Sequence, residues 1–146
     1  MLKGIPKIIS PELLKVLAEM GHGDTIVIAD GNFPSESIAK ANGNICIRMD
    51  GHGGAEVLEA ILSLFPLDPY VEKPVELMAV TPGDPVETPI WDVYKDIVKK
   101  YDKRGEDNFT EVERFKFYDN AKNAYAVIAT GEGALYANII LKKGVI

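Results

Sequence analysis

The chain has 146 residues, 47% of them hydrophobic and 26% charged, which is the balance of a soluble globular protein with one domain over residues 1–146. Sixteen basic and twenty-two acidic residues give a formal charge of −6, which argues against nucleic acid and anionic membrane surfaces as partners. Cys46 is the only cysteine, so no intrachain disulfide can form, and we expect a cytoplasmic protein without a signal peptide or membrane span.

The first half of the chain alternates predicted helices and strands. A helix begins at Ser10, whose hydroxyl can cap it and which precedes a proline at the first helical position. Its apolar residues recur at helical spacing until Gly21, which ends it. The elements expected next are a strand covered on both faces over 25–29, a helix over 37–42, a strand over 45–49 and a helix over 55–64.

The second half continues this alternation. We expect a strand over 76–80, a turn-rich surface connection over 82–89, a helix from Trp91 to Tyr101, an exposed charged stretch over 102–111, a helix over 115–124 and strands over 125–129 and 138–141. Strands alternating with helices predict an α/β fold with a largely parallel sheet. Ligands of such folds gather beyond the carboxyl ends of strands, which draws attention to Asp30 and to the loop after Thr130.

His22 is the first candidate for chemistry. It stands between Gly21 and Gly23, so that neighbouring side chains leave its ring uncrowded. A histidine can give and take a proton near neutral pH and could therefore act as a general acid. Spacing alone favours the alternative, a histidine at the end of a helix that interacts with the helix dipole or simply lies on the surface.

Four further polar residues are candidates for a binding site. Asp30 ends a predicted strand and is either a ligand-binding carboxylate or a turn residue. Tyr136 and Asn138, two apart at the start of the last predicted strand, should point to one face and could bind a polyol together, or be an ordinary strand entry. Arg114 offers several fixed donors, although an arginine near a helix start is usually a solvated charge.

Other patterns carry weaker signals. Gly51-His52-Gly53-Gly54 precedes a helix but lacks the spacing of a phosphate-binding loop, so a glycine-rich turn explains it. His22 and His52 without a ligand-spaced motif make a metal site a minor alternative. Trp91 and Tyr94 could stack on a sugar ring, but a core position is the simpler interpretation.

Taken in order, several segments resemble the family of L-fucose mutarotases and D-ribose pyranases. The resemblance covers nearly the whole chain and is weakest around residues 82–110. The segments that carry it are residues 8–24 (Ile-Ile-Ser-Pro-Glu through Met-Gly-His-Gly-Asp), Asp30 with Asn32-Phe33-Pro34, Arg114-Phe-Lys-Phe-Tyr-Asp119, Thr130-Gly-Glu132, Tyr136-Ala-Asn138 and Leu141-Lys-Lys-Gly144.

The resemblance implies a three-layer α/β/α fold and an enzyme that equilibrates the anomers of a free monosaccharide. Its proton donor would be His22, and the residues lining its sugar site would be Asp30, Arg114, Tyr136, Ala137 and Asn138. Members that act on fucose carry arginine where Arg114 stands and ribose-type members carry histidine, so the resemblance favours L-fucose. Ala137 departs from the glycine that is more usual in fucose-type members.

The proton chemistry agrees with these roles. Opening a cyclic hemiacetal requires a proton at the ring oxygen while another leaves the anomeric hydroxyl, and closing the ring reverses both transfers. The reaction needs no metal, nucleotide or redox cofactor. We expect His22 to protonate the ring oxygen, and either Tyr136 or a bound water to take the anomeric proton.

Three alternatives to a fucose mutarotase remain at this stage: a D-ribose pyranase, a non-catalytic monosaccharide-binding protein, and an oligomeric scaffold that binds no sugar. The resemblance also implies a homo-oligomer, with a ring of ten subunits as one expected arrangement and with the sugar sites close to subunit contacts. His52 receives no role.

Overall fold

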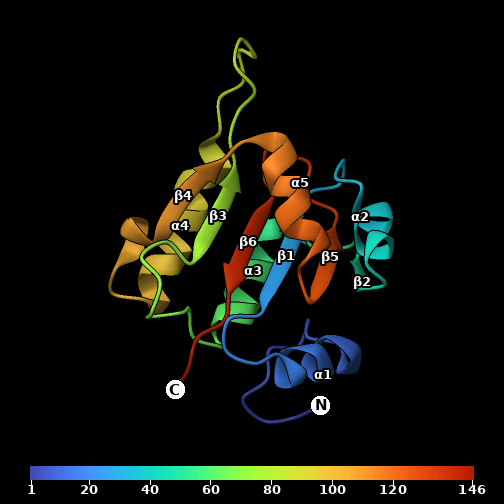
Figure 1. The fold of residues 1–146 in the computed structure, drawn as a ribbon. Helices are drawn as coiled ribbons and strands as arrows, with labels where there is room; N and C mark the ends of the chain where they lie inside the picture. The colour runs from blue at the N-terminus through green and yellow to red at the C-terminus, as the bar shows by residue number, and fades with distance from the viewer.

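The computed structural model describes residues 1–146 and is built around a six-stranded sheet (Figure 1). The strand order is β2-β5-β1-β6-β3-β4. The strands are β1 (Thr25–Ala29), β2 (Ile45–Met49), β3 (Val75–Met78), β4 (Phe109–Val112), β5 (Ala126–Thr130) and β6 (Ile139–Lys142). Their β-branched and aliphatic residues suit a pleated surface that is covered on both faces.

The sheet is parallel except for β6, which pairs antiparallel with both β1 and β3. The carboxyl ends of the other five strands therefore meet at one edge, where β6 begins; we call this the carboxyl edge. The opposite edge, where β1 and β3 begin and β6 ends, is the amino edge. The sequence-based expectation of a largely parallel sheet is confirmed.

Helices cover both faces of the sheet and give three layers, as expected (Figure 1). One core contains residues of α1 (Pro11–Glu19), α3 (Gly54–Leu62) and α4 (Pro89–Tyr101), and the other contains residues of α2 (Ser35–Ala41) and α5 (Arg114–Lys122). Alternate residues of β1 enter different cores, since Ile26 and Ile28 face the first and Val27 and Ala29 the second. Both faces of the sheet are therefore packed against helices.

The expectation that residues 102–111 form an exposed charged stretch is wrong. Residues Gly105–Asn108 form a 3-10 turn, η1, and Phe109–Val112 form β4, which pairs in parallel with β3. The strand was missed because it lies at the edge of the sheet, where Phe109 is buried but Glu111 is exposed. An edge strand of four residues has only a weak hydrophobic pattern.

The expected strand over 138–141 begins one residue later, at Ile139, so Tyr136 and Asn138 lie in the connection before it. Tyr136 is not extended but has a positive φ of 56°, the only such value at a non-glycine residue. The interpretation of Tyr136 and Asn138 as neighbours on one strand face was therefore wrong. A turn, rather than the pleat of a strand, sets the direction of the tyrosine side chain.

A long connection between β3 and α4 projects away from the body of the molecule at the carboxyl edge, whereas α1 lies at the amino edge (Figure 1). This connection is the turn-rich stretch expected over 82–89. The helices are all too short or too polar to serve as membrane spans.

Candidate functional site

A pocket of about 260 Å³ opens at the carboxyl edge, and we call it the carboxyl-edge pocket. Its lining combines apolar residues, among them Phe33, Met78 and Leu135, with side chains that can form hydrogen bonds: Asp30, Asp84, Arg114, Tyr118, Tyr136 and Asn138. Four of the five predicted sugar-binding residues are thus brought together; the fifth, Ala137, is buried between Tyr136 and Asn138. A neighbouring hollow of about 420 Å³ also reaches Asp30 but contains none of the other predicted site residues.

Asp30 and Asn138 form a buried reciprocal pair at the base of this pocket. The Asn138 amide accepts the Asp30 backbone N–H at 2.8 Å and donates to the Asp30 carboxylate at 3.0 Å. The other carboxylate oxygen accepts the Asn32 N–H at 3.0 Å. Burial raises the pKa of the Asp30 carboxyl, and hydrogen bonds from backbone N–H groups and from Asn138 offset this only in part. These hydrogen bonds fix the orientation of the Asp30 carboxylate, so the main role of the Asn138 side chain is to position Asp30.

Tyr136 is held in its unusual backbone conformation by the helix behind it. Its hydroxyl donates to Asp84 at 2.6 Å, and its carbonyl accepts the indole N–H of Trp91 at 2.8 Å. The Tyr94 hydroxyl donates to the next carbonyl, that of Ala137, also at 2.8 Å. Trp91 and Tyr94 are buried, which confirms the core interpretation, and their polar ends also anchor the site.

Replacing Tyr94 with phenylalanine is expected to lower the free energy of unfolding by about 1–3 kcal/mol, because the buried Ala137 carbonyl loses its hydrogen bond. Urea unfolding monitored by circular dichroism measures this change. Tyr101→Phe is the matched control, since the Tyr101 hydroxyl is exposed and only 3.4 Å from Glu59, and its effect should stay below about 0.5 kcal/mol. Equal effects of the two variants would contradict an anchoring role.

Arg114 begins α5 and presents its guanidinium to solvent beside the pocket. Its Nε donates to the Tyr118 hydroxyl at 3.2 Å, and its charge lies 5.5 Å from the ring centres of both Phe115 and Tyr118. These contacts hold the guanidinium while leaving its terminal N–H groups without partners in the chain. Such groups are free to donate to hydroxyl oxygens of a ligand.

His22 lies at the other end of the sheet. It precedes β1, whereas Asp30 follows it, and five extended residues at about 3.3 Å each separate the two ends of the strand by roughly 17 Å. One monosaccharide cannot bridge this distance. Within a single chain, the structure therefore does not bring His22 together with the predicted sugar-binding residues.

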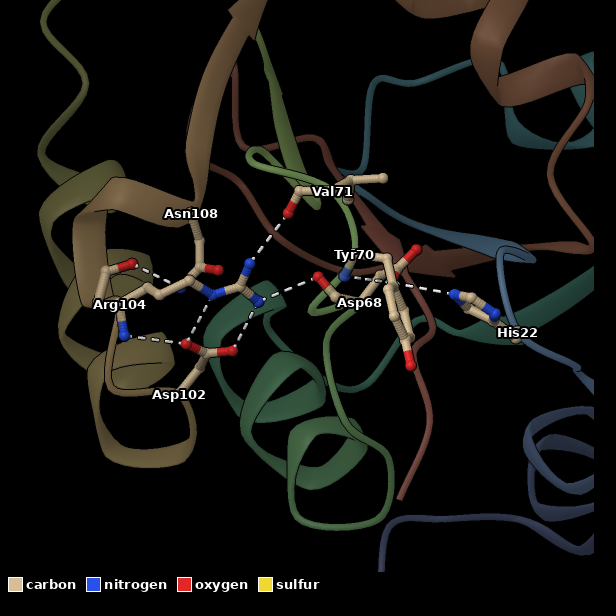
Figure 2. A network of polar contacts seen from close by, with 8 residues as sticks. His22, Asp68, Tyr70, Val71, Asp102, Arg104 and Asn108 are labelled. Atoms are coloured by element: carbon tan, nitrogen blue, oxygen red, sulfur yellow. Dashed lines mark hydrogen bonds and ion pairs between the residues drawn. The ribbon is translucent and has the colours of Figure 1, made fainter.

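The surroundings of His22 leave its ring accessible. Its side chain is 45% exposed, its Nε2 lies 3.0 Å from the buried carboxylate of Asp68, and its ring is tilted against that of Tyr70 with centroids 5.2 Å apart (Figure 2). The turn that carries it needs glycine at position 23, where φ is +86°. The His22 ring is thus accessible to solvent and is also held in place by its contacts.

The remaining candidates have structural explanations. The Gly54 N–H donates to the Glu132 carboxylate at 3.0 Å and the Gly131 N–H to the His52 carbonyl at 2.9 Å, so the glycine-rich turn packs against the loop after β5. The His52 ring pairs with Glu56 on the surface. No group of three or more histidine, cysteine, aspartate or glutamate side chains is placed to hold a metal ion.

Three polar residues beside these sites were missed from the sequence. Tyr118 lies one helical turn after Arg114, a spacing that could have indicated a shared face. Asp84 lies in the projecting connection, and Asp68 stands between prolines after α3, so each resembles an ordinary turn residue. Only the folded chain shows that one contacts Tyr136 and the other His22.

Comparisons with known proteins show which proteins this chain resembles. A fucose mutarotase from Mus musculus is 53% identical over 146 residues, covering 98% of this chain and 94% of that protein. The crystal structure of FucU from Bifidobacterium longum is 66% identical, with a TM-score of 0.96 and 99% of both chains covered. The fucose mutarotase of Streptococcus pneumoniae in complex with L-fucose is 50% identical, with a TM-score of 0.90 and the same coverage.

The family model described as the RbsD / FucU transport protein family matches residues 3–146. The sequence identity to these proteins exceeds one half, and the similarity in sequence and fold covers almost the entire chain. The chain belongs to the RbsD / FucU family.

Proposed function

We propose that this chain is an L-fucose mutarotase, an isomerase that interconverts the α and β anomers of L-fucose. The observation that carries the proposal is its identity of 50–53% to fucose mutarotases over nearly the whole chain, one of them in complex with L-fucose. Four of the five predicted sugar-binding residues also line one pocket. An arginine at position 114, typical of members that act on fucose, favours this sugar over ribose.

The reaction consists of two proton transfers and one bond change. The ring oxygen gains a proton as its bond to C1 breaks, and the anomeric hydroxyl loses one, which gives the open aldehyde. Rotation about the C1–C2 bond then exposes the other face, and reversal of both transfers closes the ring. Every proton gained at one oxygen is lost at another, so no oxidant, reductant or other co-substrate is consumed.

The carboxyl-edge pocket supplies the groups that hold the sugar. Donors from Arg114 and Tyr118 and acceptors from Asp30, Asp84 and Tyr136 suit a polyol, whose hydroxyls both donate and accept. Fixed groups of this kind lower the barrier by orienting the sugar and by stabilising charge on its oxygens. One candidate to take the anomeric proton is the Tyr136 hydroxyl, which passes its own proton to the Asp84 carboxylate as it does so, and a bound water is the other.

The proton donor reaches the sugar from a second subunit. His22 stands at the amino edge of its own chain, exposed and fixed, while the pocket lies at the carboxyl edge. We place the His22 ring of one subunit against the carboxyl-edge pocket of its neighbour. The active form is then a homo-oligomer, for which a ring of ten is one arrangement, and the lone cysteine suits a cytoplasmic location.

Saturation-transfer NMR tests the reaction directly. We expect catalytic amounts of the protein to transfer saturation between the α and β anomeric protons of L-fucose, at a rate proportional to protein concentration. With D-ribose, exchange between pyranose and furanose signals should be much slower. Faster exchange with D-ribose would instead identify a ribose pyranase, and binding of L-fucose without exchange would identify a non-catalytic sugar-binding protein.

A further inference from the structure

The first part of the connection between β5 and β6 has few packing contacts, although it leads directly to residues 136–138 of the pocket. Nothing lies within 4 Å of the position that a Cβ of Gly133 would take, and Leu135 is 52% exposed. An exposed segment of this kind is mobile unless specific hydrogen bonds hold it. The conformation of residues 131–135 therefore depends on the few hydrogen bonds that they make.

The side chain of Glu132 ties this segment to helix α3. Its Oε2 accepts the Gly54 N–H and its Oε1 accepts the Ala134 N–H, each at 3.0 Å. Gly54 is the first residue of α3, and the N-cap residue, Gly53, has no side chain to accept its N–H groups. A negative charge is favourable at this end of a helix. Glu132 therefore links the start of α3 to the backbone that leads to Tyr136.

Two close approaches of the backbone make this link possible. A Cβ at position 131 would collide with the Asp50 carbonyl, and a Cβ at position 54 would collide with the Tyr94 hydroxyl, so only glycine fits at either position. The glycine-rich turn over 51–54 thus has a structural purpose. It lets the connection after β5 lie directly against the first turn of α3.

The backbone of Glu132 is fixed to the other half of the pocket. The N–H of Gly31, which follows Asp30, donates to the Glu132 carbonyl at 2.8 Å. The Glu132 N–H donates to Oγ1 of Thr130 at 3.2 Å, and that hydroxyl donates to the Ala29 carbonyl at 2.7 Å. The main chain of Glu132 is thus held at the end of β1, while its side chain holds the residues that follow.

The charge of Glu132 also acts on Tyr94, whose hydroxyl donates to the Ala137 carbonyl. Burial raises the pKa of the Tyr94 hydroxyl well above its ordinary value, and the negative charges of Glu132 and Asp30 raise it further. A hydroxyl that keeps its proton remains a hydrogen-bond donor. The Glu132 carboxylate therefore supports the hydrogen bond that holds the backbone just after Tyr136.

We propose that Glu132 is a positioning residue for the sugar site: its carboxylate holds residues 133–135 against α3 and so fixes the place of the Tyr136 hydroxyl in the carboxyl-edge pocket. The inference rests on the proposed function, in which Tyr136 contacts the sugar. Glu132 does not line the pocket and transfers no proton. Its effect comes from geometry, since a displacement of about 1 Å can cost about 100-fold in rate.

Glu132→Gln tests this role, because an amide keeps the size of the side chain but offers one acceptor oxygen to two N–H groups. We expect kcat/KM for L-fucose exchange to fall about tenfold or more. In a Tyr136→Phe background the same substitution should change kcat/KM less than about twofold, because the hydroxyl whose position it controls is absent. A merely structural role would lower kcat/KM by the same factor in both backgrounds.

Glu56→Gln is the matched control. It removes the same charge from the same end of α3, where Glu56 pairs with the exposed His52 ring. It should leave kcat/KM unchanged in both backgrounds. An equal loss from Glu132→Gln with and without the Tyr136 hydroxyl would overturn the inference, and so would wild-type kcat/KM in a folded Glu132→Gln protein.

Carbon-13 NMR of labelled tyrosine separates this inference from the proposed function, since it needs no sugar. The Tyr136 ring signal, identified by its absence from Tyr136→Phe, should shift in Glu132→Gln and stay in place in Glu56→Gln. A Tyr136 signal that does not move in Glu132→Gln would overturn the positioning role. A wild-type protein that shows no exchange of L-fucose anomers would overturn the proposed function alone.

Amide hydrogen exchange on the unmodified protein covers the case in which Glu132→Gln does not fold. The Ala134 N–H should exchange about tenfold or more slowly than the Gly133 N–H, relative to their intrinsic rates, because Gly133 has no hydrogen-bond partner in the chain. Equal exchange of the two N–H groups would show that the carboxylate does not hold this segment, and would overturn the inference.

Discussion

Replacing His22 with alanine is expected to slow the exchange of L-fucose anomers by about 10²- to 10⁴-fold, the usual contribution of a positioned acid or base. Binding of L-fucose should persist, because the sugar-binding groups lie in the carboxyl-edge pocket, whose own lining contains no histidine. Saturation-transfer NMR measures the exchange rate, and calorimetric titration measures the binding. Loss of exchange with binding retained identifies the imidazole as a catalytic residue.

Two further variants make this result specific. His22→Gln keeps an amide donor near Asp68 but cannot exchange protons near neutral pH, so it should be as slow as His22→Ala even if the buried carboxylate remains satisfied. His52→Ala removes the other histidine, which pairs with Glu56 on the surface, and should retain full activity. Wild-type exchange in His22→Gln would show that a different group donates the proton.

Mixing two inactive variants is expected to restore activity if each site is shared between subunits. His22→Ala lacks the donor and Arg114→Ala lacks a sugar-binding group, yet a neighbouring pair can combine the intact pocket of the first with the intact histidine of the second. When the two variants are co-expressed in equal amounts and assemble at random, about a quarter of the sites contain both intact halves. Exchange should therefore recover to about that fraction of the wild-type rate.

The control is a mixture of His22→Ala with His22→Gln, which cannot regenerate an intact donor and should stay inactive. Native mass spectrometry establishes that mixed oligomers have formed. Mixed His22→Ala and Arg114→Ala oligomers with no recovered activity would place both groups in one chain's site and would contradict the shared arrangement. Static light scattering on the wild-type protein gives the subunit number independently.

The layered fold could be predicted from the sequence because its elements have strong and distinct periods. The buried run of β1 and the capped start at Ser10 both lie where the pattern places them. The elements that were misread are those in which tertiary contacts override local preference. β4 forms because β3 offers it a partner, and Tyr136 adopts its positive φ because Trp91 and Tyr94 bind the carbonyls beside it.

Four of the residues predicted for the site line one pocket, but their position relative to His22 was not predicted. Asp30 and Asn138 are 108 positions apart in the sequence and meet as expected from a shared edge. His22 is only eight positions from Asp30, yet an extended strand places the two at opposite ends of the sheet. Asp68 had no recognisable pattern, because its pairing with His22 depends on contacts made by Arg104 and by the end of the chain.

Strand β6 runs from the carboxyl-edge pocket to the connection that contains Asp68, and so links the two regions. Asn138 comes immediately before this strand and secures the pocket, while Lys142 and Gly144 at its other end secure the connection that bears Asp68. The four extended residues of β6 thus fix the distance between the carboxyl-edge pocket and the connection that contacts His22 of the same chain. Inserting or deleting one residue within 139–142 would exchange the side chains facing the two cores and shift both anchors at once.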